Sequence, residues 1–366
     1  MTSFAVTPPT LIPVSDSPHL TSHVFYNYLI PLLHTTFTKD HKAKIHLDLR
    51  GIDTISPQAL VGLLIVGEIL RKHYEEPVDL ILEWKAELLG YLNEMGFFRI
   101  NKQLDLFNYD RRLQGGFEPI DPTDFHFLER FQIPDKSVPD SEVFVYDPVE
   151  TLTQNVTHLL SSAKNKESFK KFFKSESLYN QFKDIIMELV ENAAKHGDSP
   201  CYVVAYGNRK KGLICAASDI GIGFFRSLTS PDNLGKLKLF SQRELFLKDG
   251  RHNLRAILEA VYRRVGTQTF GIASFTDNAT SKGGVVRIHS ENTQIVFTQR
   301  TYREFIGSTK SDRKFIHDLM NYFEIRKSWA PSIRESPLRV WDAKLSGVHV
   351  EIEIPPLFIS DRRDAI

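Results

Sequence analysis

The chain has 366 residues, more than one compact core usually needs, so we expect two domains. Hydrophobic residues make up 42% of it and charged residues 25%, a composition that excludes a largely disordered chain. The 46 basic and 45 acidic residues leave a formal charge of +1, so we expect neither a nucleic acid nor a membrane as partner.

The cysteine count and the apolar runs indicate where the protein works. Cys201 and Cys215 are too few for a disulfide framework or a four-thiolate zinc site. The longest apolar run, from Ala59 to Leu70, is shorter than the roughly 20 residues of a membrane span. The first twenty residues carry no Lys or Arg, which a secretory signal would need. We therefore expect a cytoplasmic protein.

Hydrophobic patterning divides the chain into two α/β blocks. We expect an irregular lead-in over 1–18, a first block over 19–105, a connector over 106–148, a second block over 149–357 and a tail over 358–366. The lead-in is rich in Pro, Ser and Thr, and the connector has scattered Pro, Gly and Asp without a sustained period.

The first block alternates strands and helices. Apolar residues at every second position predict strands within 44–50 and 78–84. Between them, Ser56 is a suitable N-cap and Pro57 fits the first helical position, so we expect a helix there that is apolar on most faces and buried. A shorter helix follows and ends at Gly96. This succession is typical of a small α/β domain.

The second block contains more elements. Its pattern predicts helices over 151–163, 176–196 and 254–265, and strands over 201–207, 213–219, 285–290, 294–298 and 348–354. In the last strand, Val and Ile at even positions alternate with His349, Glu351 and Glu353. We therefore expect one dry and one solvated sheet face.

The helix around 184–197 carries the first chemical signal. Glu188, Asn192 and Lys195 share a face that is distinct from the apolar stripe. A carboxylate and an amide four residues apart are neighbours, and together they can present oxygens to Mg²⁺ while the carboxylate polarises a water or hydroxyl. The alternative is the solvated face of an ordinary amphipathic helix.

The second signal follows about thirty residues later. A strand ends at Asp219, and Gly221 and Gly223 occupy the turn. Glycines there let the backbone approach a ligand closely, and the carboxylate can accept a hydrogen bond from an exocyclic amine. Taken alone, the same residues could form only a tight turn.

Together, MELVENAAKHG and SDIGIGF resemble, in order and spacing, the two motifs of the gyrase, heat-shock chaperone, histidine kinase and MutL (GHKL) ATP-binding superfamily. The form ELVENAAKHG is most similar to the anti-sigma-factor serine kinases. The resemblance implies an α/β sandwich with a mixed sheet, with ATP and Mg²⁺ bound on its helical side under a mobile lid.

The resemblance also implies roles for individual residues. Glu188 would be the general base, Asn192 the Mg²⁺ ligand and Asp219 the acceptor for the adenine amine, while Gly221 and Gly223 would shape the pocket. Lys195 and His196, which continue the first motif, are assigned to the nucleotide site with them.

One motif departs from the family. Its second glycine-rich run is represented only by GRHNLRAILEAV, where Gly250 is kept but Arg251 and His252 replace small residues. These two residues either contact phosphates or are ordinary loop residues, and the departure bears on catalysis more than on nucleotide binding. We treat residues 298–345 as an insertion.

The first block resembles a STAS-like domain, the fold of anti-sigma-factor antagonists. In that family a phosphoacceptor Ser begins the helix, a position that Gln58 occupies here. Ser56 lies two residues earlier and is expected to be a helix cap rather than a phosphosite.

These features predict a regulatory protein that uses Mg²⁺–ATP for phosphoryl transfer to a serine of a partner protein, or for slow, hydrolysis-linked switching. The alternative is a non-catalytic interaction module that docks a regulatory partner through its STAS-like block. The sequence leaves both functions open, and it also leaves open whether the protein forms a homodimer.

Overall fold

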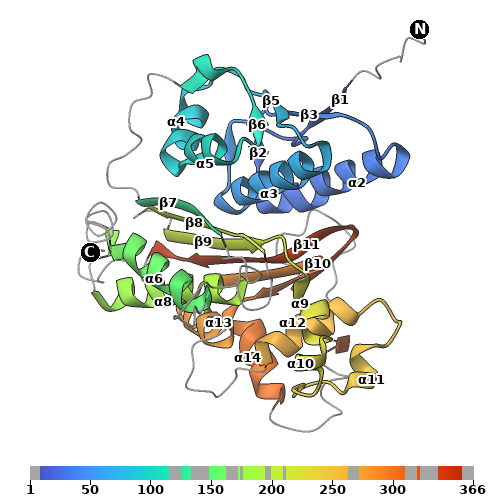
Figure 1. The fold of residues 1–366 in the computed structure, drawn as a ribbon. Helices are drawn as coiled ribbons and strands as arrows, with labels where there is room; N and C mark the ends of the chain where they lie inside the picture. The colour runs from blue at the N-terminus through green and yellow to red at the C-terminus, as the bar shows by residue number, and fades with distance from the viewer. Residues whose placement is uncertain are drawn as a thin grey trace, which may run out of the picture. The chain divides into compact units, whose positions relative to one another are not determined.

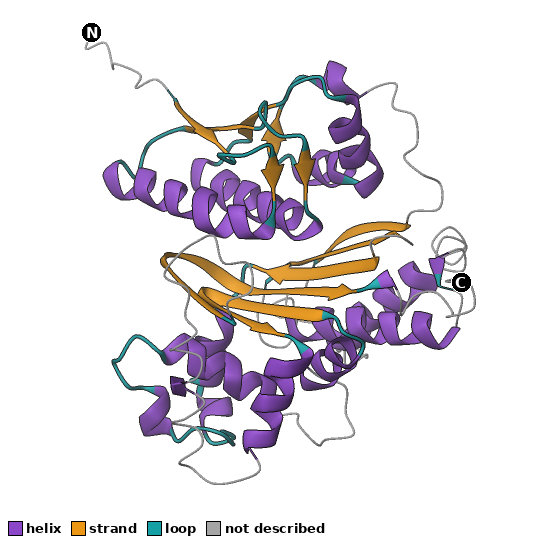
Figure 2. Cartoon of the chain, turned by 180° about the vertical axis from the view of Figure 1, so that it is seen from behind, coloured by secondary structure: helices purple, strands orange, loops and turns teal. Residues whose placement is uncertain are grey.

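A computed structural model describes ten stretches of the chain. They are residues 9–114, 125–132, 148–161, 172–173, 176–193, 199–208, 212–262, 272–309, 320–321 and 337–356. The chain forms two compact units (Figures 1 and 2). The first comprises Met1–Asp121 with Trp341–Lys344, and the second comprises Pro122–Val340 with Leu345–Ile366.

The first unit is built on a parallel sheet. Its strands, in spatial order, are β1 (Thr10–Pro13), β3 (Ile45–Asp48), β5 (Val78–Ile81) and β6 (Phe107–Asn108), and β2 (His19–Leu20) pairs separately with β4 (Thr54–Ile55). The prediction of an irregular segment is wrong for residues 10–13, which form an edge strand. Only Ile12 is buried in this strand, so hydrogen bonding to β3 defines it rather than an apolar pattern.

The helices of the first unit are α1 (Ser22–Val24), the π-helical turn η1 (Phe25–Leu29), α2 (Ile30–Lys39), α3 (Pro57–Tyr74), α4 (Ala86–Met95), α5 (Phe97–Leu104) and the 3₁₀ turn η2 (Arg111–Gln114). Two of them, α3 and α4, carry the predicted start and end signals, and the others were not predicted. Helix α3 is buried on most faces, and the Ser56 hydroxyl caps it by accepting from the Ala59 N–H at 3.3 Å. Gly96, at φ 86°, ends α4 as expected. Gln58 is buried and donates to the Tyr26 hydroxyl at 3.3 Å.

The expected connector contains strands of both units. Its first residues form β6, and β7 (Phe125–Phe131) pairs with the second sheet. In β7 the buried residues are Phe127, Leu128 and Phe131, which do not alternate strictly. That irregular pattern explains why the sequence shows no sustained period there.

The second unit is built on a five-stranded sheet. Its strands, in spatial order, are β10 (Val285–Phe297), β11 (Leu338–Ile354), β9 (Gly212–Asp219), β8 (Cys201–Asn208) and β7. All four pairings among these described strands are antiparallel, so the expectation of a mixed sheet is wrong. Each strand meets neighbours that run the opposite way, including β11 and β9, which lie far apart in the sequence.

Helices cover one face of this sheet (Figures 1 and 2). They are α6 (Pro148–Ser161), α8 (Glu176–Asn192), α9 (Gly223–Leu228), α10 (Pro231–Leu234), α11 (Gln242–Leu245), α12 (His252–Tyr262), α13 (Ile272–Ser281) and α14 (Gln299–Thr309). The core lies between the two layers, where Val203 and Cys215 of the sheet belong to one buried cluster with Ile186 of α8 and Ile257 of α12. This layering leaves the ends of α8 and β9 together at one edge of the core.

Two strands are longer than predicted. Segments 285–290 and 294–298 form the single strand β10, interrupted by a register shift at Glu291, whose φ is 58°. Strand β11 begins at Leu338, so it includes residues that the sequence analysis assigns to an insertion. Another described part of that insertion contains α14.

The sheet face opposite the helices is polar and is buried at His349 and Glu351, which corrects the second half of the prediction for 348–354 at these two positions, whereas Glu353 is partly exposed. His349 and Glu351 are only 2% and 4% exposed. Arg287 on β10 reaches Glu351 at 3.5 Å and Glu353 at 2.6 Å, and the rings of His289 and His349 lie 5.4 Å apart. Cross-strand partners therefore replace water around these groups.

None of the helices in the described stretches combines the length and hydropathy needed to span a membrane.

Candidate functional site

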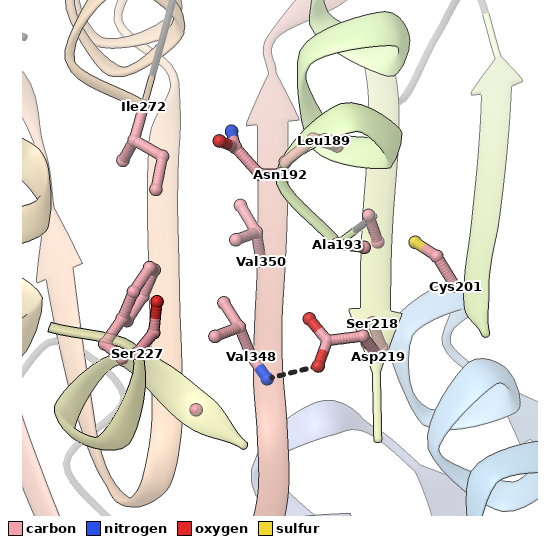
Figure 3. A pocket seen from close by; sticks show the side chains of 13 residues that line it. Leu189, Asn192, Ala193, Cys201, Ser218, Asp219, Ser227, Ile272, Val348 and Val350 are labelled. Atoms are coloured by element: carbon pink, nitrogen blue, oxygen red, sulfur yellow. Dashed lines mark hydrogen bonds between the residues drawn. The ribbon is translucent and has the colours of Figure 1, made fainter. Parts of the chain in front are cut away.

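A pocket opens where the C-terminal end of α8 meets the end of β9 and the interior of β11 (Figure 3). Its lining is apolar apart from a few polar groups. The lining residues are Leu189, Asn192, Ala193, Cys201, Ala217, Ser218, Asp219, Gly223, Phe224, Ser227, Ile272, Val348 and Val350. Three of the predicted site residues, Asn192, Asp219 and Gly223, thus line one pocket.

Asp219 is the charged group of this pocket and is 5% exposed. Its Oδ1 accepts hydrogen bonds from the backbone N–H groups of Gly221 at 2.8 Å and Val348 at 3.3 Å. Figure 3 shows the other carboxylate oxygen directed away from Val348 and into the pocket. Burial raises the pKa of this carboxyl to about 7. Within the described stretches Oδ2 has no donor, so it is free to meet a polar group of a ligand.

The backbone of β11 approaches Asp219 unusually closely. Gly347 has φ +99°, and a Cβ there would lie 2.0 Å from the carbonyl oxygen of Asp219. Only glycine fits this approach without displacing one of the two chains. It brings the N–H of Val348, the next residue, to the Asp219 carboxylate.

Glu188 and Asn192 form a pair one turn apart on α8. The Asn192 Nδ2 donates to Glu188 Oε1 at 2.6 Å, as the spacing predicts. Asn192 lines the pocket, whereas Glu188 is 7% exposed and does not belong to the lining. The hydrogen bond occupies the amide nitrogen and leaves the carbonyl oxygen of Asn192 for a ligand. Lys195 and His196 lie outside the described residues.

The two glycines after Asp219 have different roles. Gly221 supplies the N–H that holds the carboxylate. Gly223 adopts φ +72° and begins α9, where it lines the pocket. Gly223 therefore lines the pocket, whereas Gly221 acts on it only through Asp219.

The segment around Gly250 does not line the pocket. Gly250 is exposed with φ +75°, and the next two residues lead into α12. The Arg251 N–H donates to Asp249 Oδ1 at 3.1 Å, while the ring of His252 packs on Phe225 at 4.8 Å. Arg255 pairs with Asp249 and holds the pKa of that carboxyl at about 2. Local contacts of Asp249 and of His252 thus fix this turn.

Sequence reasoning missed several lining residues. Leu189 and Ala193 belong to the apolar stripe that we expected to face only the core, yet they line the pocket together with Asn192. The expectation that Asn192 lies on a face distinct from that stripe is therefore wrong at this end of the helix. Val348 and Val350 read only as the dry face of a strand. No local pattern could indicate that this strand lies beside β9, because the two are separated by more than a hundred residues.

The pocket suits a planar, mostly apolar ring that carries a hydrogen-bond donor at its edge. Apolar walls would cover the ring faces, and Asp219 would accept from the donor. Among the described residues no group of three or more His, Cys, Asp or Glu side chains is arranged to hold a metal ion. A cation here would therefore depend on ligand oxygens as well as on Asn192.

Comparisons of the chain with models of protein families, with curated proteins and with solved structures find no match.

Proposed function

We propose that the second unit binds ATP with Mg²⁺ in the pocket between α8, β9 and β11, and that it is a GHKL-type α/β sandwich. The observation that carries this proposal is the Asp219 carboxylate, which is buried, fixed on one oxygen by two backbone N–H groups and open on the other toward an apolar pocket. An adenine ring matches this arrangement in two ways. Its apolar faces can pack on the pocket walls, and its exocyclic amine can donate to the open carboxylate oxygen.

The order of elements supports the same proposal. Helix α8 with Glu188 and Asn192 precedes the β8–β9 hairpin, Asp219 ends β9, and α9 begins at Gly223. Residues far apart in the sequence thus meet in one pocket in the order that the motif resemblance implies.

The residues present fit a Mg²⁺ ion carried by a nucleotide. Mg²⁺ usually keeps one or two protein ligands and takes its other oxygens from phosphates and water. The Asn192 carbonyl oxygen provides one such ligand, because the amide nitrogen is already engaged by Glu188. When bound, the ion would neutralise charge on the phosphates.

Glu188 is the residue suited to move a proton. Its Oε1 accepts from the Asn192 amide, which fixes the carboxylate beside a residue that lines the pocket. In this position Glu188 would take the proton of an attacking serine hydroxyl or water. The reaction would be phosphoryl transfer to a partner protein or slow hydrolysis.

A second candidate function is nucleotide binding without turnover. It is favoured by the turn before α12, where the Asp249–Arg255 ion pair and the His252–Phe225 contact occupy a segment that is glycine-rich in the resembling family. Such a module would use the nucleotide to set its interaction with a regulatory partner, docked through the first unit.

We also propose a cytoplasmic location for the protein. The two cysteines of the chain, Cys201 and Cys215, form no disulfide and are buried, which suits a reducing compartment.

The decisive experiment is calorimetric titration of the full chain with a non-hydrolysable ATP analogue, with and without Mg²⁺. We expect Mg²⁺-dependent binding that Asn192→Ala weakens. Asn108→Ala is the matched control, since it removes an exposed amide that donates to Asp79 at 2.9 Å outside the pocket. Absence of binding to a protein that unfolds cooperatively would reject the proposal.

Turnover separates the two candidate functions. Glu188→Gln keeps an acceptor for Asn192 but removes the base, so it should retain analogue binding and lose at least about 100-fold in phosphate release or transfer. If the wild-type chain binds the analogue and shows no turnover with ATP, the non-catalytic function is the better one.

A further inference from the structure

The hydroxyl of Ser290 links two walls of the pocket without facing it. Its oxygen accepts from the N–H of Phe224 at 3.1 Å and donates to the carbonyl oxygen of Gly347 at 3.4 Å. Ser290 is fully buried, and these two contacts use its one donor and one of its two acceptor lone pairs. The hydroxyl therefore joins the start of α9 to β11.

The β10 strand places this hydroxyl by a local irregularity. Ser290 pairs with Val348, and the register shifts directly after it at Glu291, which adopts φ 58°. Bulges of this kind re-aim side chains. The fit at Ser290 is tight, because a Cβ on Gly223 would lie 3.0 Å from the hydroxyl oxygen.

Both segments held by Ser290 act on the candidate ligand-binding groups. Phe224 lines the pocket as the second residue of α9. Gly347 precedes Val348, whose side chain lines the pocket and whose N–H donates to Asp219 Oδ1. A shift of Gly347 would therefore move the donor that orients the carboxylate.

We infer that Ser290 is a positioning residue that sets the orientation of Asp219 toward the exocyclic amine of a purine ring. The inference rests on the proposed nucleotide function. It adds that Ser290, which does not line the pocket, helps the protein to distinguish a purine with an exocyclic amine from one without it. Removing the hydroxyl leaves the buried N–H of Phe224 without its partner and frees Gly347, so the loss should fall on ligands that use the Asp219 carboxylate.

The test compares two ligands, a non-hydrolysable ATP analogue and the corresponding triphosphate of purine riboside, which lacks the exocyclic amine. The wild-type chain should bind the first more tightly. Ser290→Ala should weaken the ATP analogue about ten-fold and the amine-free ligand much less. Ser281→Ala is the control, since it removes an exposed hydroxyl that donates to Asn278 at 2.9 Å on α13 and should change neither affinity.

The outcomes separate the inference from the proposed function. If the wild-type chain binds neither ligand, the proposed function fails. If it binds and discriminates but Ser290→Ala weakens both ligands equally, or neither, the positioning role is rejected. Equal wild-type affinity for both ligands also rejects it while leaving nucleotide binding intact. Should Ser290→Ala not fold, Ser290→Cys keeps the shape with a poorer acceptor and is measured in the same way.

Discussion

The two faces of the second sheet both bury charged groups, and they neutralise them differently. On the helical face, Asp219 is held by two backbone N–H groups on one oxygen, and its other oxygen opens on the pocket. On the opposite face, Arg287 lies between Glu351 and Glu353. A buried charge with a protein counter-charge is complete as folded, whereas a buried carboxylate with one unoccupied oxygen is suited to a ligand.

The difference also appears in the direction of the pKa shifts. Burial raises the pKa of Asp219 to about 7, and none of the described residues supplies a counter-charge to it. On the opposite face, burial lowers the pKa of His349 to about 4 and that of His289 well below its usual value. The two faces should thus respond to pH in opposite senses, and the predictions below test each face separately.

The largest effect is expected from Gly347→Ala, which tests the close approach of the Gly347 backbone to the Asp219 backbone beside the pocket. The new Cβ would lie 2.0 Å from the Asp219 carbonyl oxygen at a φ of +99°. We expect a loss of about 3 kcal/mol or more in the free energy of unfolding, measured with denaturant. Gly235→Ala has open space and an ordinary φ, and it should cost less than about 0.5 kcal/mol. A fully stable Gly347→Ala chain would contradict the close approach.

The next effect concerns the pH dependence contributed by Asp219. Its pKa is raised from 3.8 in the unfolded chain to about 7, so the folded state binds the proton more tightly. The stabilising contribution is complete below about pH 4 and is lost as the pH rises through 7. Between pH 5 and 8 wild-type stability should fall by about 2 to 3 kcal/mol relative to Asp219→Asn, in which that slope is absent.

Ligand binding sharpens the same test. Asp219→Asn replaces the ionisable acceptor, so it should weaken the ATP analogue strongly while leaving the chain as stable as wild type, or more so, at pH 8. Denaturant curves at several pH values with parallel titrations measure both quantities. An Asn variant that is unstable at pH 8 would mean that the carboxylate is a structural group like those on the opposite face.

Arg287→Met makes the complementary test on that opposite face. It removes the guanidinium that lies 3.5 Å from the buried Glu351 carboxylate, and we expect a loss of about 2 kcal/mol in stability with no change in affinity for the ATP analogue. Arg300→Met removes an exposed ion pair with Glu304 and should cost no more than about 0.5 kcal/mol. If Arg287→Met also weakened binding of the ATP analogue, the polar face would not be purely structural, and the proposed difference between the two sheet faces would be rejected.

Local chemistry made much of this molecule predictable from sequence. The Ser56 cap, the Gly96 helix end and the spacing of Asn192 and Asp219 depend on neighbouring residues or on helix periodicity, and the structure confirms the first two and brings the last pair into one pocket. The edge strand at Thr10–Pro13 was missed, because one buried side chain leaves no pattern.

Long-range contacts were beyond sequence patterns for a physical reason. The Val348 N–H that holds Asp219 is a backbone donor 129 residues away, and every residue except proline carries such a group. The burial of Glu351 likewise depends on Arg287 across a strand pair. A polar residue at an alternating position predicts a solvated face only when no neighbouring strand supplies its partner.

The smallest effect should come from His349→Gln, which tests the pH response of the polar face. The folded pKa of about 4 lies below the usual 6.5, so the unfolded chain takes up the proton first and stability is lost as the pH falls below 6.5. Glutamine retains a donor toward the Ser346 carbonyl, which His349 Nε2 contacts at 3.2 Å, and it does not titrate. The variant should therefore lose about 1 kcal/mol less than wild type between pH 6.5 and 5, as followed by denaturant unfolding, whereas His158→Gln on the exposed surface of α6 should match wild type. The slope of His349 between about pH 4 and 6.5 is opposite in sign to that of Asp219 between about pH 4 and 7, so the two contributions should largely offset each other in the wild-type chain over this range, and each variant should expose the slope of the other group.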